Sequence, residues 1–367
     1  MISPEQSACQ GIKGIPPCTV GSRAYDGIPD VLRPFGDTAL LIGGHRALRA
    51  GLALLQGALN GSGIRLTVSP FDRECTLSGA QAYAKEAQST RAAVILGMGG
   101  GKALDTAKVA AHLAGLPVIT LPTIPATCAA VTALSVLHEE GGSVGSPFLF
   151  LDQPPKHAFL HTGVLSASPA QYLRAGIGDS LAKHVESAFK AGDGSKLSYP
   201  DRLGLAAARM GYDTLLDLGV QALADAELGL DTEAYRTAVM CCIINTGVVS
   251  LLVQERLNGA LAHSLFYALR DNPVFAGFLH GDVVAWGSAV QLMLERKPAE
   301  ASRLLAFLKA LGVPPAQGGC RFSADSIRGW AALALQQTDM ADTPCPVDEP
   351  MVLDAVERVE FLKQEVA

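Results

Sequence analysis

The sequence predicts an α/β protein with a doubly wound parallel sheet, followed by an all-helical C-terminal part. Up to about residue 160, short apolar runs alternate with segments of helical periodicity, as in a parallel sheet wrapped by helices. Beyond that point, long segments rich in alanine and leucine carry apolar residues at helical spacing. We therefore expect an α/β domain over residues 1–160 and a helical domain over residues 161–367, with the boundary loop within residues 140–166.

Each element of the first part is predicted from a short local pattern. Residues 39–44 are apolar and end in two glycines, so they are expected to form a strand that ends in a turn. Residues 48–59 carry apolar side chains at helical spacing. Glycine and proline cluster in the first 20 residues, which are expected to form an irregular arm. Further strands are predicted at residues 64–68, 92–96 and 117–121, and further helices at residues 80–88 and 103–113.

The second part begins with a helix-start pattern at Ser168 and Pro169. Serine is a preferred capping residue, and proline is favoured at the first helical position. Cys241 and Cys242 are expected to pack inside a buried helix. Helical periodicity predicts helices at residues 170–190, 202–224, 232–269, 282–295, 300–311 and 350–365.

Composition and charge exclude several classes of protein. Of the 367 residues, 49% are apolar and 17% are charged, which suits a folded protein with a sizeable core. The net charge of −6 argues against a nucleic-acid-binding protein. We expect no apolar run long enough to cross a bilayer, and residues 1–7 lack the pattern of a signal peptide. The 8 cysteines include no Cys-x-x-Cys pair, so we expect mostly reduced thiols in a cytoplasmic protein.

A run of glycines behind the strand at residues 92–96 is the most informative feature. Gly99, Gly100 and Gly101 are followed by Lys102 and a predicted helix. Glycine lets backbone N–H groups approach a bulky anion closely, and a helix N-terminus adds a partial positive charge. The segment matches neither the Walker motif nor the standard dinucleotide fingerprint. It predicts a phosphate cradle for a nucleotide or dinucleotide; the alternative is an ordinary tight turn between a strand and a helix.

Two further segments carry candidate chemistry. The loop at residues 121–135 follows a predicted strand, and its small and hydroxyl side chains suit the wall of a cofactor groove. Asp179, His263 and His280 stand in apolar helical surroundings, and together they are able to bind a divalent metal. The alternatives are histidines that simply complete the core and an aspartate that caps a helix.

Together these segments resemble the iron-containing alcohol dehydrogenase superfamily and, within it, the glycerol-dehydrogenase-like branch. The resemblance implies a nucleotide-binding α/β domain, a helical metal-binding domain of the dehydroquinate-synthase-like architecture, and a cleft for NAD(P) and substrate. It rests on four motifs that follow the family's order and spacing: Gly99-Gly100-Gly101-Lys102-x-x-Asp105-x-Ala107-Lys108, Pro122-Thr123 through Ala133-Leu134-Ser135, Gly176-x-Gly178-Asp179, and His280-Gly281.

The resemblance also implies the roles of individual residues. A divalent metal, zinc or iron, would be held by Asp179, His263 and His280, which would be catalytic. The glycine cradle would hold the pyrophosphate of the cofactor, and the loop at residues 123–134 would flank its nicotinamide. The implied cofactor positions are Gly101, Lys102, Asp105, Thr123, Ala126, Thr132, Leu134 and His138, of which Ala126 and His138 replace a usual serine and a frequent aromatic.

Two differences from glycerol dehydrogenases concern the substrate. Those enzymes have an aspartate where this chain has Cys128, and a thiol is a poor acceptor for polyol hydroxyls. Residues 127–130 and 178–183 resemble a bacterial subgroup of hydroxycarboxylate dehydrogenases, which reduce 2-oxo acids and prefer NADPH. Lys183 follows Asp179 by one helical turn, so its charge would hold a substrate carboxylate beside the metal. The alternative is that Lys183 pairs with Glu186 or extends into solvent.

The residues after the first predicted strand concern the adenosine end of the cofactor. Family members that use NAD often have an acidic residue there, whereas this chain has Gly44, followed by His45 and Arg46. Without that carboxylate a 2′-phosphate is not repelled, and Arg46 is able to pair with it. We therefore favour NADP over NAD; the alternative is that Arg46 is an ordinary exposed helix residue.

The sequence thus predicts a metal-dependent, NAD(P)-linked oxidoreductase that interconverts a small 2-oxo acid and a 2-hydroxy acid. The rival functions are a glycerol or other polyol dehydrogenase, and a lyase or cyclase of the dehydroquinate-synthase type. Asp282 is interpreted as an exposed carboxylate at a helix start, with a contact to a metal-binding imidazole as the alternative. The expected partners are a small-molecule substrate and further copies of the chain in a homo-oligomer, but no nucleic acid and no membrane.

Overall fold

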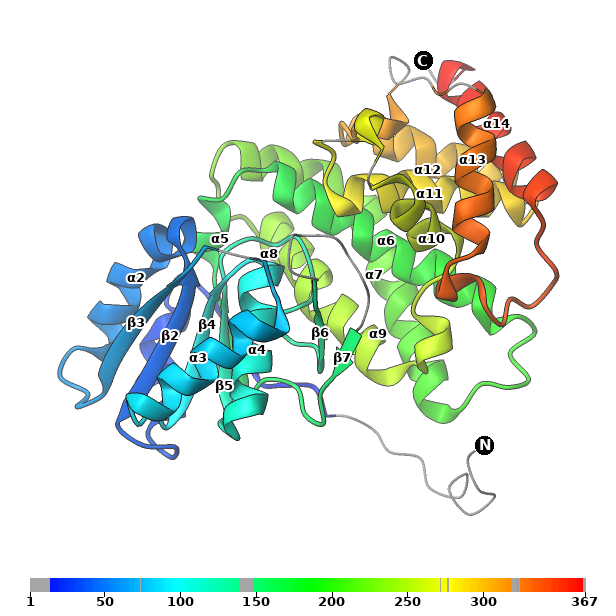
Figure 1. Cartoon of the computed structure of the whole chain (residues 1–367). Coiled ribbons are helices and arrows are strands. Elements are labelled where there is room, and N and C mark those ends of the chain that lie inside the picture. The colour runs from blue at the N-terminus through cyan, green and yellow to red at the C-terminus, as the bar shows by residue number, and fades with distance from the viewer. Residues whose placement is uncertain are drawn as a thin grey trace, which may run out of the picture.

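The computed structural model describes residues 14–72, 74–138, 148–270, 272–275, 277–317, 322 and 324–365. Figure 1 shows a part built on a parallel sheet beside a part built from helices. The predicted fold class, a wound parallel sheet followed by a helical part, is therefore confirmed.

Six parallel strands form the main sheet, in the order β1-β8-β5-β4-β2-β3. This order places β4 beside β2 although β3 lies between them in the chain, so the direction of winding reverses there. Open α/β sheets bind ligands at such a reversal, beyond the carboxyl ends of the strands. The strands are β1 Cys18–Gly21, β2 Thr38–Gly44, β3 Arg65–Phe71, β4 Val94–Gly99, β5 Val118–Pro122 and β8 His157–His161.

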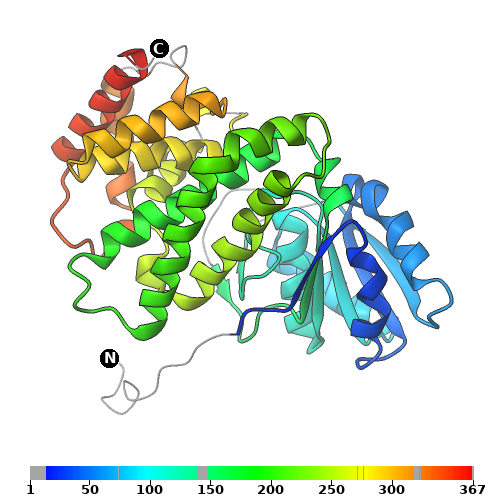
Figure 2. The ribbon, with the colours of Figure 1, turned by 180° about the vertical axis from the view of Figure 1, so that it is seen from behind.

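Alternate residues of the central strands face opposite layers of helices. Leu41 and Leu96 pack in a cluster with α1 and α2, whereas Leu40 and Ile95 pack with α3 and α4. Figure 1 shows α3 and α4 on the near side of the sheet, and Figure 2 shows α1 on the other side. Both faces of the sheet are thus buried, as parallel sheets require. These helices are α1 Ile28–Leu32, α2 His45–Leu59, α3 Leu77–Ser89 and α4 Gly101–Ala114.

The sequence patterns do not reveal several short elements of this part. β1 begins at Cys18, inside the expected irregular arm, and it pairs with β8 at the edge of the sheet. A separate antiparallel pair is formed by β6 (Leu134–Val136) and β7 (Phe148–Phe150), and β8 is followed by α5 (Thr162–Ser166). Elements of three to five residues carry too little periodic pattern to be distinguished from loops.

The helical part packs around its own buried core. α6 lies in contact with both α7 and α11, and the long pair α6–α7 can be followed in Figure 2. Trp286 of α11 is fully buried and contacts the rings of Phe275 and Phe322. The helices are α6 Gln171–Ala191, α7 Tyr199–Glu227, α8 Glu233–Met240, α9 Thr246–Leu252, α10 Leu261–Leu269, α11 His280–Leu294, α12 Pro298–Ala310, α13 Ala324–Leu335 and α14 Glu349–Glu365.

The prediction of one continuous helix over residues 232–269 is wrong. The chain is helical from Glu233 to Leu252, through a π-helical turn between α8 and α9, and then leaves the helix until Leu261. Val253 has extended backbone, with φ −80° and ψ 149°. Val253, Leu257 and Ala260 keep helical spacing through this break, which is why periodicity alone does not show it. α13 was not among the predicted helices.

The helical run Glu233–Leu252 corrects a second expectation. By length and composition alone it is apolar enough to cross a membrane, so the expectation that no run reaches that length is wrong. However, 61% of its most apolar window is buried inside the protein, a property of core helices. Cys241 and Cys242 in this run are buried, as expected for packing residues.

Candidate active site

The candidate segments meet at the carboxyl ends of the central strands. Gly44 ends β2 and caps α2, and Gly100 follows β4 and caps α4. α6 of the helical part approaches the loop after β5 very closely, because a Cβ atom on Gly176 would lie 1.9 Å from the carbonyl oxygen of Pro125. The sheet part and the helical part are therefore in contact at the edge where ligands are expected.

Glycines also bring α6 against α11. A Cβ atom on Gly178 would lie 2.3 Å from the carbonyl oxygen of Gly281, and one on Gly281 would lie 1.8 Å from that of Ala175. Real Cβ atoms do not approach other atoms within 3.0 Å, so neither position accepts a side chain without a shift of backbone. This close approach of the two helices places Asp179 next to His280, and it gives the physical reason for the glycines beside both residues.

Asp179, His263 and His280 converge on one small volume. Oδ1 of Asp179 lies 3.5 Å from Nε2 of His263 and 3.4 Å from Nε2 of His280. One possible ligand atom from each residue lies within 4.8 Å of the others. Because metal–donor distances are about 2.0–2.2 Å, atoms this close are able to share one ion. Asp179 and His263 are buried, whereas the His280 side chain is 34% exposed, so this side of the cluster is open.

Glu186 belongs to the site although no motif pointed to it. It is fully buried, and its Oε2 accepts a hydrogen bond from Nδ1 of His263 at 2.5 Å. Its Oε1 accepts from the backbone N–H groups of Ala260 and His263, at 2.8 and 2.9 Å. The carboxylate thus fixes the ring of His263 with Nε2 toward Asp179, as carboxylates behind metal-binding histidines do. The available signal was spacing, since Glu186 follows Asp179 by two helical turns.

Neighbouring charges shift the pKa values in this cluster. Burial lowers the pKa of His263, but the Glu186 carboxylate and the hydrogen bond with Asp179 raise it to about 10 overall. Burial raises the pKa of Asp179, but hydrogen bonds from His263 and His280 hold it far below its ordinary value. A divalent cation bound here would replace the proton on Nε2 of His263. One carboxylate and two imidazoles suit zinc or iron, so the residues fit the metal that the resemblance implies.

Lys183 lies on the same helix as Asp179, one turn later. Its Nζ donates to the backbone oxygen of Asn258 at 3.3 Å, and it does not pair with Glu186, whose oxygens are engaged by α10. Burial raises the pKa of the Cys128 thiol. The nearby charge of Lys183 lowers this pKa, and the charge of Asp179 raises it. Both charges therefore lie near Cys128, so the structure brings the predicted substrate-binding residues close to the cluster.

Three of the predicted cofactor positions belong to one internal network. Asp105 and Lys108 form a buried ion pair of 2.9 Å. Nζ of Lys108 also donates to the backbone oxygen and the hydroxyl of Thr132, both at 3.3 Å, and to the backbone oxygen of Leu134. Asp105 accepts from the N–H of Val136 at 3.1 Å. The network holds the loop before β6 against α4, and the contacts of Asp105, Thr132 and Leu134 with a cofactor stay a prediction.

Packing alone accounts for part of the glycine run. Gly99 has φ +156°, which side chains rarely allow, and a Cβ atom on Gly100 would lie 2.6 Å from the side chain of Ile124. The N–H of Thr123 donates to the oxygen of Gly99 at 3.1 Å and ties the loop after β5 to the cradle. Gly101 begins α4, whose first N–H groups have no acceptor within the helix and are available to an anion.

Lys102 does not extend freely over the cradle. Its Nζ lies 2.6 Å from Oε1 of Glu74, which follows β3 and was not identified by any motif. The other oxygen of Glu74 lies 3.9 Å from Nδ1 of His138, too far for a hydrogen bond. The N–H of His138 donates to the oxygen of Cys75 at 2.7 Å, which keeps His138 beside Glu74. Two predicted cofactor positions, Lys102 and His138, therefore flank one carboxylate.

The segment predicted to bind the adenosine end of the cofactor is open to solvent. A Cβ atom on Gly44 would meet no atom nearer than the oxygen of Phe71 at 3.8 Å. The first turn of α2 carries no acidic residue, and His45 and Arg46 are exposed without a partner among the described residues. Ala126, another predicted cofactor position, is half-buried beside Gly176.

Comparisons with known proteins decide the family. Residues 16–161 match the family model described as iron-containing alcohol dehydrogenase. The chain is 31% identical over 298 residues to a glycerol dehydrogenase of Escherichia coli O6:H1, and the match covers 80% of both chains. The chain belongs to the iron-containing alcohol dehydrogenase family.

Two further relatives place this dehydrogenase in the glycerol-dehydrogenase-like branch. It is 36% identical over 256 residues to hydroxycarboxylate dehydrogenase A of Escherichia coli K12, with 70% of each chain covered. Its fold matches the crystal structure of a probable glycerol dehydrogenase from Sinorhizobium meliloti 1021, with a TM-score of 0.83 and 25% identity, over 97% of this chain and 100% of that chain. The predicted family branch and the predicted enzyme class, an oxidoreductase, are confirmed.

Asp282 of this dehydrogenase has a different role from either one expected. It is fully buried, so the interpretation as an exposed carboxylate is wrong. The Arg174 guanidinium donates to its two oxygens at 2.8 and 3.0 Å, and the N–H of Leu279 donates to it at 3.1 Å. Among the described residues no imidazole bonds to it. Asp282 instead ties α6 to the start of α11, because the glycine contact between these helices leaves it facing α6.

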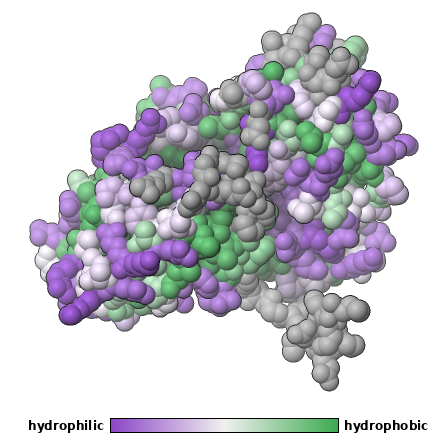
Figure 3. Space-filling view, in the orientation of Figure 1, coloured by the Kyte–Doolittle hydropathy of each residue, from purple (hydrophilic) through white to green (hydrophobic). Residues whose placement is uncertain are grey.

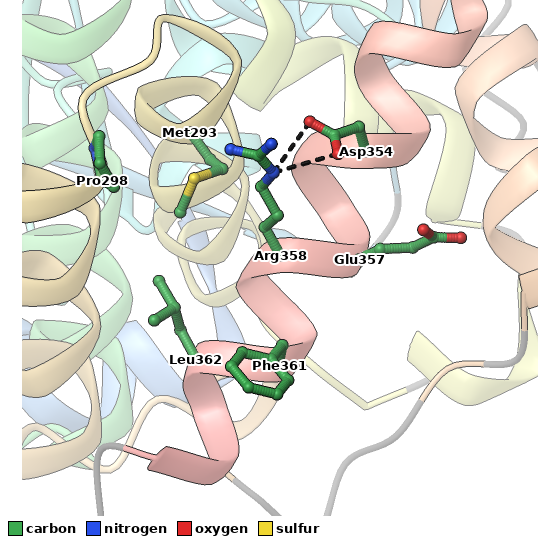
Figure 4. Close-up of a pocket in the computed structure, with 7 residues that line it drawn as sticks. All are labelled: Met293, Pro298, Asp354, Glu357, Arg358, Phe361 and Leu362. Carbon is green, nitrogen blue, oxygen red and sulfur yellow. Dashed lines mark hydrogen bonds and ion pairs between the residues drawn. The ribbon is translucent and has the colours of Figure 1, made fainter.

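A hollow of about 360 Å³ lies elsewhere in the dehydrogenase, among α11, α12 and α14 (Figure 4). It is lined by apolar side chains such as Met293 and Phe361 and by the Asp354–Arg358 ion pair. It shares no residue with the candidate site and is therefore not part of it.

Proposed function

We propose that this dehydrogenase interconverts a small 2-oxo acid and the corresponding 2-hydroxy acid, with NADP(H) preferred over NAD(H). The observation that carries the proposal is the position of Lys183, one helical turn from Asp179 and close to Cys128. A lysine there supplies a charge for a carboxylate, and the thiol of Cys128 offers polyol hydroxyls little. The 36% identity with hydroxycarboxylate dehydrogenase A supports the same substrate class.

Asp179, His263 and His280 would hold the divalent metal, zinc or iron. Three protein ligands leave a position for substrate, as in catalytic zinc sites. The bound metal would polarise the substrate carbonyl as a Lewis acid, and the nicotinamide would supply the hydride. We propose that Gly99, Gly100 and Gly101 accept the pyrophosphate of the cofactor.

The other residues of the site would orient its ligands. Glu186 keeps Nδ1 of His263 protonated, so that Nε2 remains available as a ligand atom. Lys183 would exchange its bond to the oxygen of Asn258 for a bond to the substrate carboxylate. The absence of an acidic residue at Gly44, together with the exposed Arg46, favours the 2′-phosphate of NADP(H).

A glycerol or other polyol dehydrogenase is the second candidate function, favoured by the 31% identity with a glycerol dehydrogenase over 80% of both chains. The two functions differ in the charge of the substrate. If the wild-type enzyme, reconstituted with zinc or iron, were more active with glycerol than with 2-oxobutyrate and NADPH, the second candidate would replace the first. The lyase or cyclase of the rival prediction gains no support, since the reported relatives are dehydrogenases.

Replacement of Lys183 by methionine tests the proposed substrate class. Methionine keeps the length of the side chain but removes its charge, and a charge-assisted hydrogen bond is worth about 1.5–3 kcal/mol. We expect the KM for 2-oxobutyrate to rise about 10- to 100-fold, with little change in the KM for neutral glyceraldehyde. Lys85→Met, on the exposed side of α3, is the matched control. Equal losses with both substrates would contradict the role of Lys183.

The remaining expectations are also proposals. We place a domain boundary near residue 160, since β8 ends at His161 and helices follow.

We propose a cytoplasmic homo-oligomer. The free thiols of the described cysteines support the compartment. The exposed rings of Phe148 and Phe150 support self-association. Figure 3 shows hydrophobic residues gathered in the lower middle of the molecule, with hydrophilic residues around them.

A further inference from the structure

The first turn of α4 carries a cation that is already neutralised. Lys102 follows the glycine run directly, and its Nζ lies 2.6 Å from Oε1 of Glu74. Glu74 belongs to a different segment, the loop between β3 and α3. The side chains of Lys102 and Glu74 are 54% and 36% exposed, so the pair is within reach of solvent and of ligands. An anion that approaches the helix N-terminus therefore meets a carboxylate as well as an ammonium group.

The second oxygen of Glu74 has no hydrogen-bond partner among the described residues. This oxygen is buried, and it lies 3.9 Å from Nδ1 of His138, which also has no partner. Burial lowers the pKa of His138, so that imidazole contributes little positive charge at neutral pH. The ammonium group of Lys102 is thus the cation to which the Glu74 carboxylate is hydrogen bonded.

We propose that Glu74 masks Lys102 and thereby weakens the binding of the dinucleotide pyrophosphate in the cradle. A pyrophosphate that pairs with Lys102 must displace the carboxylate, which then remains close to the phosphate charges. Glu74 would thus lower the affinity for the cofactor indirectly, through its ion pair with Lys102. The inference rests on the proposed function, because it requires NAD(P)(H) at the glycine cradle.

The exposure of the pair sets the size of the effect. An exposed ion pair, once removed, changes an affinity by no more than about fivefold. A mask of this strength is weak enough for the cofactor to displace at each turnover. Weaker binding also favours release of the spent cofactor, and product release limits the turnover of many enzymes.

Glu74→Gln provides the test, because glutamine keeps the shape of the side chain and removes its charge. We expect the Kd for NADH, measured by nicotinamide fluorescence, to fall about fivefold at low ionic strength. The inhibition constant of ADP against NADH should fall by a similar factor, and that of adenosine, which has no phosphate, should stay unchanged. Glu86→Gln is the control, since the Glu86 carboxylate accepts a hydrogen bond from Ser69 of β3 and is not bonded to Lys102.

Lys102→Met completes the test. In the Glu74→Gln background, where Lys102 is free to pair with the pyrophosphate, this change should remove the gain in NADH affinity that Glu74→Gln produces. The advantage of Glu74→Gln should also shrink as salt is raised, because exposed charges are screened over about 8 Å at physiological ionic strength. A purely structural role for Glu74 would not produce this dependence on ligand charge and salt.

The contrary results are equally clear. Unchanged or weaker NADH binding by Glu74→Gln, or an equal gain for adenosine and ADP, would overturn the inference. If Glu74→Gln did not fold, as judged by circular dichroism, Glu74→Ala would be measured with the same expected result. A wild-type enzyme that bound neither NADH nor NADPH would remove the proposed function itself, a result distinct from a failure of Glu74→Gln.

Discussion

The metal cluster and the phosphate cradle are built in different ways. In the cluster, His263 is buried and bonded on both sides, to Glu186 and to Asp179. In the cradle, the Lys102–Glu74 pair is partly exposed, and Arg46 has no partner among the described residues. The first region is fixed by its own hydrogen bonds, whereas the second would have to exchange its contacts to bind the proposed cofactor.

This difference matches the residence of the two proposed ligands. A metal that stays bound benefits from donors fixed in advance by packing and by hydrogen bonds behind them. A dinucleotide that enters and leaves at each turnover is better served by contacts that are individually weak. Substitutions should therefore have large effects in the cluster and small ones in the cradle.

The largest effect is expected for Asp179→Asn. The amide keeps the shape of the side chain but removes the charge that attracts a cation to the cluster. Because metal polarisation contributes several kcal/mol to such reactions, kcat/KM should fall by at least about 10³-fold. Metal content, measured by atomic emission spectroscopy, should fall with it. The control is Asp217→Asn, an exposed aspartate on α7; an Asp179→Asn enzyme with full metal content and activity would break the comparison.

Glu186→Gln should weaken the cluster without removing a ligand. The neutral amide no longer stabilises the ring of His263 by charge, although its oxygen is still able to accept the backbone bonds. The Kd for zinc, measured by competition with a chelator, should rise about 10- to 100-fold. An unchanged Kd would show that Glu186 has only a packing role.

Metal binding should depend on pH in a definite direction. The pKa of His263 is raised to about 10, so below that pH a metal must displace its proton. The Kd for zinc should therefore fall as the pH rises from 6.5 to 9, by about tenfold per unit for one released proton. In Glu186→Gln the window should move to lower pH, because Glu186 is the strongest raising influence on this pKa. A Kd that is independent of pH would contradict this account of the cluster.

The smallest of these four effects is expected for Gly44→Asp, which would place a carboxylate directly after β2. Gly44 has φ −63° and room for a Cβ atom, so the substitution causes no backbone strain. The new charge should repel a 2′-phosphate and accept the ribose hydroxyls of NADH. The ratio of kcat/KM for NADPH to that for NADH should fall on the order of tenfold. Arg46→Gln should lower the same ratio, whereas Arg49→Gln, one turn later on α2, should not.

The family resemblance supplied the set Asp179, His263 and His280, whose metal binding stays a prediction. The sequence patterns themselves predicted four of the six strands of the main sheet and the glycine run. Each depends on a local pattern: apolar runs for buried strands, and glycines where backbones must approach closely, as at Gly178 and Gly281. Glu186, Glu74 and Asp282 were missed or misjudged because their roles depend on partners far away in the chain. No periodicity records such contacts, and a polar residue near a helix start is usually exposed.

The central claim is that Asp179, His263 and His280 share one divalent cation. The most direct measurement is an anomalous difference map from crystals of the zinc-loaded enzyme, recorded above and below the zinc absorption edge. We expect one strong peak per chain, at about 2.0–2.2 Å from an oxygen of Asp179 and from Nε2 of both histidines. A peak at another place, or no peak between these three side chains, would contradict the account.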